Sequence, residues 1–255
     1  MPILTLTTDF GDKSFDIAAL KGKLMSVSLG IIIIDITHNI EIYDKLNAAY
    51  SLKNASINFP PKTIHFTNIN LKEGNNRYLI VERNSQYYIC PDNGLINMMF
   101  PEEDFKAYTI KNIDSDFSYN EIHNKLCEIV KFAENDYDIT TFGTLTTSYL
   151  RSPILRAAIM PDHLQGTVIY TDRNENAIIN ISKEMFYNYV ENRPFKISVR
   201  KDHVTKIHNH YSDVEPGEMV CIFNSANLLE IAINNGSSKK LLGLKYANLI
   251  MIEKL

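Results

Sequence analysis

The sequence predicts an α/β N-terminal domain, with a largely parallel sheet and flanking helices, followed by an all-β, barrel-like C-terminal domain. Strand-like and helix-like stretches alternate over about the first 135 residues, an order typical of α/β folds. Roughly the last 90 residues instead contain short strand-like stretches separated by turn-rich pieces. Pro153 and Pro161 interrupt the pattern between these parts. We therefore assign residues 1–150 to a nucleoside-binding α/β domain and residues 160–255 to a β-barrel domain.

The elements of the first part follow from its apolar patterns. Residues 3–8 read as a buried strand, and residues 14–26 carry apolar side chains at helical spacing. Residues 31–37, IIIIDIT, form a continuous apolar run that predicts a strand covered on both faces. The same reasoning predicts, in chain order, a helix at 43–54, strands at 63–69, 77–82 and 86–90, a short helix at 94–100, a strand at 105–110 and a helix at 120–134.

The second part is predicted from short apolar stretches bounded by turn residues such as DRNEN and EPGE. The expected strands are residues 166–172, 176–182, 195–200, 219–225, 228–234 and 249–254.

Composition narrows the class of protein. The net charge of −4 gives no reason to expect a nucleic-acid partner, and no apolar run reaches the length of a membrane-spanning helix. The N-terminus has no secretory pattern, and the three cysteines form no CxxC pair. We expect a cytoplasmic protein with reduced cysteines, no metal site and no membrane partner.

Familiar phosphate and zinc motifs (GxGxxG, GxxxxGK[ST], HExxH) do not occur in the sequence. Asp9, in TTDFG, stands where the first strand ends, and ligands of open α/β sheets bind beyond the carboxyl ends of strands. A carboxylate there can accept two hydrogen bonds from the vicinal hydroxyls of a ribose. The alternative is that Asp9 only caps the following helix.

Two further clusters favour turns on composition alone. CPDNG, at residues 90–94, and the Asn-rich stretch at 224–238 contain the residues that form turns. An Asn at a strand end can also bind the edge of a base, because its amide is both donor and acceptor.

Several motifs in fixed order make the chain resemble the S-adenosyl-L-methionine hydroxide adenosyltransferase family, which includes fluorinating and chlorinating enzymes. These motifs are TTDFG, ALKG, DITHNI, PDNGL and NSANLLEIAI with GSS. The resemblance implies S-adenosyl-L-methionine as substrate, no further cofactor, and a homotrimer. It also implies a ligand bound between the N-terminal domain of one subunit and the C-terminal domain of the next.

The resemblance also implies roles for individual residues. Asp9 would bind the ribose, and Tyr43 would be the neighbour that follows DITH. The motif D-x-F-G-N-x-x-T-N, which would hold the methionine part, falls on DRNENAIIN. Asp172, Asn176 and Asn180 are retained there, and Asn174-Glu175 replace Phe-Gly. The adenine contacts would be Ser225, Asn234 and Asn235.

Two departures concern the residues that handle water. Asn70 stands where water-using relatives carry an acid, in INLKEGNNR, and Arg77 keeps its spacing. Ser118 stands where the family has a catalytic His. Asn70, Arg77 and Ser118 are thus the candidate catalytic positions.

The chemistry leaves the nucleophile open. Water benefits from a base, which an amide such as Asn70 cannot provide near neutral pH, whereas a halide needs none. Other candidate bases are Glu73, Glu121, His65 and His123. The short links within residues 72–94 disfavour fluoride, because fluorinating relatives carry a long insertion. The sequence predicts release of methionine with adenosine or a 5′-halo-adenosine; the alternative is a catalytically impaired protein that binds the nucleoside.

Overall fold

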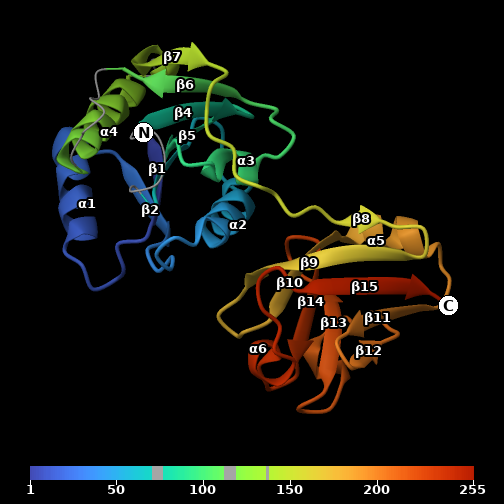
Figure 1. Ribbon diagram of the computed structural model, residues 1–255. Helices are drawn as coiled ribbons and strands as arrows, with labels where there is room; N and C mark the ends of the chain where they lie inside the picture. The colour runs from blue at the N-terminus through green and yellow to red at the C-terminus, as the bar shows by residue number, and fades with distance from the viewer. Residues whose placement is uncertain (71–76, 112–118, 136–137) are drawn as a thin grey trace. The chain divides into compact units, whose positions relative to one another are not determined.

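The computed structural model describes residues 1–70, 77–111, 119–135 and 138–255 (Figure 1). The chain divides into two compact units, Met1–Pro153 and Ile154–Leu255, each with its own sheet and buried core. The first unit is α/β and the second is built on an antiparallel sheet, so the predicted fold class is confirmed.

A seven-stranded sheet runs through the first unit in the order β2-β1-β3-β5-β4-β6-β7. Its strands are β1 (Ile3–Thr8), β2 (Ile32–Thr37), β3 (Ile64–Asn68), β4 (Tyr78–Arg83), β5 (Gln86–Pro91), β6 (Lys106–Ile110) and β7 (Gly143–Thr146). Strands β2, β1, β3 and β5 pair in parallel, and β4 is antiparallel to both β5 and β6. Because β6 therefore points the same way as β5, most strands share one direction.

Helices cover both faces of this sheet (Figure 1). They are α1 (Asp16–Val27), α2 (Lys45–Ser56), α3 (Leu95–Met99) and α4 (Tyr119–Glu134), with a 3-10 turn η1 (Ile139–Phe142). Leu24 of α1 and Leu126 of α4 share one buried cluster with Ile80 of β4. Leu52 of α2 shares a second cluster with Leu79 of β4. Since successive strand residues point to opposite faces, β4 is buried from both sides.

The expectation that residues 31–37 form a strand covered on both faces is wrong. β2 is the edge strand of the sheet, and Ile32 and Ile34 are 43% and 39% exposed. The apolar run reveals the strand, but whether its faces are covered depends on strand order, which the run does not encode. The elements predicted for the first unit otherwise appear within two residues at each end, while β7 was not predicted.

A tight hairpin joins β4 to β5. Its two turn residues, Asn84 and Ser85, have φ of 49° and 61°, as the two-residue turns that match strand twist require. The register runs from Arg83 opposite Gln86 to Tyr78 opposite Pro91. The next residues, Arg77 and Asp92, therefore stand side by side, and the Asp92 N–H donates to the Arg77 carbonyl at 2.9 Å.

The second unit contains an eight-stranded sheet in the order β12-β11-β15-β9-β10-β14-β13, with β8 paired to β9. Its strands are β8 (Ala158–Ile159), β9 (His163–Thr171), β10 (Ala177–Ser182), β11 (Phe195–Val199), β12 (Asp202–Val204), β13 (Met219–Phe223), β14 (Leu228–Ile233) and β15 (Leu249–Lys254). The end strands β12 and β13 lie in contact, and His208 N beyond β12 donates to Cys221 O of β13 at 2.8 Å. The sheet thus curls into a barrel-like shape.

Helical pieces complete this unit: α5 (Lys183–Val190), α6 (Ser238–Leu241) and the 3-10 turn η2 (Tyr211–Asp213). The sequence did not predict α5. Its N-cap Ser182 accepts a hydrogen bond from Met185 N at 3.1 Å, and Phe186 is buried in the barrel core.

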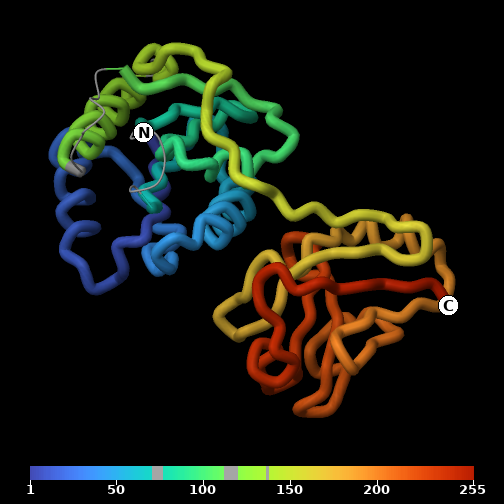
Figure 2. Tube along the Cα trace, viewed as in Figure 1, coloured from blue at the N-terminus to red at the C-terminus, as the bar shows by residue number. Residues whose placement is uncertain are grey.

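The segment that follows β7 lies along the first unit, as the chain path in Figure 2 shows. Ser152 N donates to Asn97 Oδ1 at 2.9 Å, and Asn97 Nδ2 donates back to Ser152 O at 3.0 Å. Leu150 N donates to Asp92 Oδ1 at 2.8 Å. These bonds fasten the segment to α3 and to the turn after β5.

All three cysteines, Cys90, Cys127 and Cys221, are buried and free. Among the described residues, no group of three or more His, Cys, Asp or Glu side chains is arranged to hold a metal ion. None of the helices in the described ranges is long and apolar enough to cross a membrane.

Candidate active site

Polar residues gather at the carboxyl ends of three neighbouring strands in the first unit. Asp9 follows β1, Asn70 follows β3, and Asp92 and Asn93 follow β5. Strands β1, β3 and β5 are adjacent and parallel, so their carboxyl ends meet at one edge of the sheet. Open α/β sheets bind their ligands at such an edge.

The Asp9 carboxylate is held by the backbone rather than by a side chain. Its Oδ2 accepts a hydrogen bond from Asn70 N at 2.8 Å, and Asp9 N donates to Asn68 O at 3.4 Å. Asn70 has φ of 48°, in the left-handed region that Asn tolerates better than most residues. Asn70 therefore contributes a backbone N–H that orients Asp9, a role that reasoning from its side chain missed.

His38, from the DITH segment, holds the loop that carries Asp9. Its Nδ1 lies 2.9 Å from Thr8 Oγ1, and its carbonyl accepts from Gly11 N at 2.8 Å. Its Nε2 lies 3.1 Å from Asp35 Oδ1. The residues on both sides of Asp9 are thus fixed to one histidine.

Arg77 forms an ion pair with Asp92, a residue that the sequence assigned only to a turn. Arg77 Nε donates to Asp92 Oδ2 at 2.6 Å, and its Nη2 donates to the Ser148 carbonyl. The Asp92 side chain is fully buried, whereas that of Arg77 is 28% exposed. The pairing could have been found from the sequence, because a two-residue turn at 84–85 places residues 77 and 92 opposite each other.

Asn93 links the turn after β5 to the end of β3. Its Nδ2 donates to Ile69 O at 2.9 Å, and its Oδ1 accepts from Leu95 N at 3.2 Å. Lys45 Nζ donates to the Asn93 carbonyl at 2.9 Å. A continuous chain of contacts therefore runs from Asp9 to the Arg77–Asp92 pair.

Among the remaining candidates of the first unit, Tyr43 is linked to this chain through Lys45, whose N–H donates to the Tyr43 carbonyl at 3.0 Å. Tyr43 lies in the turn before α2, 66% exposed and with φ of 72°. Ser118 and Glu73 lie outside the described residues. Glu121 is exposed at the start of α4.

Two histidines were candidate bases. His123 packs against Phe10 and Phe66, with ring centroids 6.4 and 6.2 Å apart, and burial lowers its pKa. Phe10 directly follows Asp9 in the chain, so His123 lies beside the Asp9 loop. His65 is fully buried within β3 and belongs to the core.

A cavity of about 740 Å³ in the second unit brings together several predicted substrate contacts. Asn176, Asn234 and Asn235 line it, together with Tyr211. Asp172 Oδ1 and Oδ2 accept from Asn176 N and Nδ2 at 2.8 and 3.2 Å, so the DRNEN segment forms a closed turn.

Ser225 is placed elsewhere in the second unit. It is exposed in the turn before β14, whereas Asn234 follows β14. A strand of this length spans about 20 Å, so the structure does not bring Ser225 into the cavity with the asparagines.

Glu230 and Tyr211 were missed by the sequence analysis. Tyr211 OH donates to Glu230 Oε1 at 2.6 Å, and Glu230 is 3% exposed in the middle of β14. Burial raises the pKa of Glu230. Alternation along LLEIAI places Glu230 on the face opposite Leu229 and Ile231, which lie in the barrel core, so the pattern alone does not predict that Glu230 is buried.

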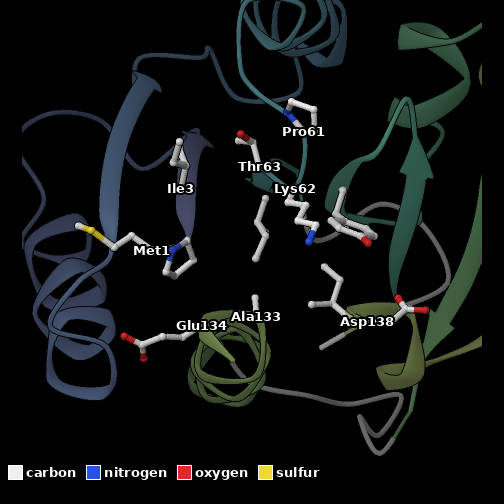
Figure 3. A pocket seen from close by; sticks show the side chains of 12 residues that line it. Met1, Ile3, Pro61, Lys62, Thr63, Ala133, Glu134 and Asp138 are labelled. Atoms are coloured by element: carbon white, nitrogen blue, oxygen red, sulfur yellow. The ribbon is translucent and has the colours of Figure 1, made fainter. Parts of the chain in front are cut away.

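Another cavity, of about 540 Å³, lies in the first unit (Figure 3). It is at the end of the sheet opposite to Asp9 and Asn70. Ile3, Thr63 and Tyr87 line it, at the amino ends of β1, β3 and β5. None of the predicted site residues lines this cavity.

Fold and site together define a class of protein: an α/β unit with polar groups gathered at its strand ends, joined to a barrel-like unit with a polar cavity. The chain belongs to the S-adenosyl-L-methionine hydroxide adenosyltransferase family. The family's N-terminal domain model matches residues 4–129, and its C-terminal domain model matches residues 166–251. The resemblance seen in the sequence is thereby confirmed.

Two curated relatives are both named (R)-S-adenosyl-L-methionine hydrolase. The protein from Methanocaldococcus jannaschii is 28% identical over 267 residues, covering 99% of this chain and 96% of the relative. The protein from Thermus thermophilus is 24% identical over 260 residues, covering 93% and 94%.

Solved structures share the fold. An uncharacterized conserved protein from Thermotoga maritima superimposes with a TM-score of 0.85 at 23% identity, and both chains are covered completely. A conserved hypothetical protein from Thermus thermophilus gives a TM-score of 0.77 at 22% identity, again over both whole chains.

Proposed function

We propose that this protein is an enzyme that hydrolyses S-adenosyl-L-methionine to adenosine and L-methionine. A water oxygen forms a bond to the 5′ carbon of the ribose while the carbon–sulfur bond breaks. The electron pair of that bond stays on sulfur, which becomes the neutral thioether of methionine, and the proton of the water passes to a base or to solvent. Because methionine leaves readily, the protein has mainly to hold the water in line and limit its hydration.

One observation carries the proposal: Asp9, Asn70 and Asp92 lie at the carboxyl ends of three adjacent parallel strands, and Arg77, just before the antiparallel strand β4, pairs with Asp92. This is where α/β sheets bind nucleoside ligands. The two relatives named as hydrolases of this substrate, matched over nearly the whole chain, support the same reaction.

The roles of individual residues remain part of the proposal. Asp9 would accept hydrogen bonds from the ribose, and Arg77 would act at the reacting centre together with positions 70 and 118. The other proposed substrate contacts are Tyr43, Asp172, Asn176, Ser225, Asn234 and Asn235. No cofactor beyond the substrate is part of the proposed reaction.

A second candidate function is binding of the nucleoside without turnover. It is favoured by Asn70, whose amide cannot take a proton from water near neutral pH. Chloride is a second candidate nucleophile, since a halide needs no base.

One experiment separates these functions. Purified protein is incubated with S-adenosyl-L-methionine in ¹⁸O-labelled water, with and without chloride, and the nucleosides are identified by mass spectrometry. We expect labelled adenosine and an equal amount of methionine, independent of chloride. A 5′-chloro-adenosine would identify chloride as nucleophile. Absence of any product, with adenosine still bound in calorimetry, would support the binding function.

We further propose a homotrimer, as the family resemblance implies. The exposed apolar edge formed by Ile32 and Ile34 of β2 supports association with another chain, because such an edge is an aggregation liability when left uncovered. Light scattering at micromolar concentration is expected to give the mass of three chains, and a monomer would contradict the proposal.

A further inference from the structure

We propose that Asp92 and Asn93 are the two positioning residues of this site, with separate tasks. Asp92 orients the Arg77 guanidinium, and Asn93 orients the Ile69–Asn70 peptide and through it the Asp9 carboxylate. The inference rests on the proposed function and gives roles to two residues for which the family resemblance implies none.

The first step concerns the charge beside Arg77. Asp92 is a fully buried carboxylate whose two oxygens accept from Arg77 Nε, at 2.6 Å, and from Leu150 N, at 2.8 Å. The Ser148 carbonyl accepts from Arg77 Nη2. Two groups on different segments, the Asp92 carboxylate and the Ser148 carbonyl, thus hold the guanidinium. Hydrogen bonds to ionised groups are the strong ones.

The Arg77–Asp92 pair changes how the acid-to-amide replacement at position 70 is interpreted. An acid at position 70 is not required to neutralise Arg77, because Asp92 already lies against its Nε. The chain instead uses the backbone of residue 70, whose N–H donates to Asp9 Oδ2 at 2.8 Å. Asn suits this task because the peptide must turn through the left-handed region, where φ is 48°.

The second step concerns the peptide that carries this N–H. Asn93, 2% exposed, donates from Nδ2 to Ile69 O at 2.9 Å. Ile69 O and Asn70 N belong to the same peptide group, so one planar unit is bound by Asn93 on one side and by Asp9 on the other. Without the Asn93 amide, the Ile69–Asn70 peptide could rotate. The Asp9 carboxylate, which this peptide holds, would then lose its fixed orientation.

The two tasks predict opposite kinetic signatures for neighbouring residues. Asp92→Asn keeps an acceptor for Leu150 N but removes the negative charge that pairs with Arg77. We expect kcat to fall by about 10²-fold, the cost of a misplaced reacting group. Its adenosine affinity should stay within about threefold of wild type, since Asp9 is untouched. Asn93→Ala should weaken adenosine binding about tenfold, a change of about 1.4 kcal/mol.

Asn97→Ala is the matched control. Asn97 is another buried asparagine, 4% exposed, and bonds only Ser152 among the described contacts. We expect it to lower the free energy of unfolding without changing kcat or adenosine affinity. Asp92→Asn is also made in an Arg77→Gln background, where it should have no further effect on kcat, because Asp92 acts through Arg77.

The outcomes are distinct. Equal losses of kcat and affinity in Asp92→Asn and Asn93→Ala, or the same profile in Asn97→Ala, would overturn the proposal in favour of general loss of structure. If Asp92→Asn does not fold, the comparison made in the Arg77→Gln background decides its role. Wild-type protein that binds adenosine but never cleaves the substrate refutes the proposed function and the role of Asp92 with it, while calorimetry of Asn93→Ala still decides the role of Asn93.

Discussion

His65 should make the stability of the first unit depend steeply on pH. It is completely buried in β3, with Nδ1 2.7 Å from Thr5 Oγ1 and its ring stacked 4.8 Å from that of Tyr88. Within the described structure its Nε2 makes no hydrogen bond of normal geometry, and the nearby Gln86 side chain offsets only part of the effect of burial on its pKa. A proton added to this nitrogen would place an uncompensated charge in the core.

The magnitude follows from the pKa. Burial lowers the pKa of His65 to about 4, below its ordinary value of 6.5. The unfolded chain therefore takes up a proton at a pH where the folded chain does not, and stability falls as the pH is lowered from 6.5 towards 4. A shift of this size corresponds to about 3 kcal/mol in total, of which about 2 kcal/mol would be lost between pH 7 and pH 4.5.

The assay compares wild type with His65→Asn, which keeps a polar atom near Thr5 and removes the titration. The chain contains no Trp, so urea unfolding is followed by far-UV circular dichroism at several pH values. Carboxylates titrate alike in both proteins, so the difference between the two pH profiles isolates His65. His65→Asn is expected to be less stable at pH 7, because the stacked ring is lost, but to lose about 2 kcal/mol less on acidification.

Parallel pH profiles for the two proteins, differing by a constant offset, would refute this reasoning. They would mean that His65 has the same pKa in the folded and the unfolded chain, because a neighbouring group compensates the charge.

Three further predictions concern the sites and the turn after β5. Asp9→Ala should weaken adenosine binding by about 1.5–3 kcal/mol in calorimetry, the range for hydrogen bonds to a charged group. An unchanged affinity would show that Asp9 does not bind the ribose. Glu230→Gln should be at least as stable as wild type at pH 7, because its pKa is raised by burial, whereas Glu230→Ala should lose about 1–3 kcal/mol by leaving Tyr211 OH without its acceptor. Equal urea midpoints for these two variants would contradict this. Gly94→Ala should cost about 1–3 kcal/mol in thermal unfolding, since φ is 86° and the added carbon would lie 2.9 Å from Ser152 N; an unchanged midpoint would show that the turn adapts.

Local pattern was enough to predict most elements of the fold. Helical spacing in residues 14–26 and 120–134 predicted α1 and α4, and both place their apolar side chains in one core. The pattern failed where burial depends on distant partners. Residues 31–37 look like a central strand, yet β2 has a neighbour on only one side of the sheet.

The candidate site was harder to predict from the sequence than the fold. Asp9 stood out because a strand end precedes it, and its position among the strand ends agrees with that reasoning. Asp92 looked like turn material, because its partner Arg77 is 15 residues away and becomes its neighbour only across a hairpin. Asn70 was judged by its side chain, whereas the contact that the structure describes is made by its backbone.

The two-residue turn between β4 and β5 also restricts how this chain can change in length. Arg77 faces Asp92 only while both arms of the hairpin contain the same number of residues. One inserted residue in either arm would shift the pairing by one position and turn the following side chains to the opposite face of the sheet. Insertions could persist there only in pairs, one in each arm. Natural variants of this chain should therefore vary in residue identity between positions 77 and 92, while the number of residues between these positions should change only in steps of two.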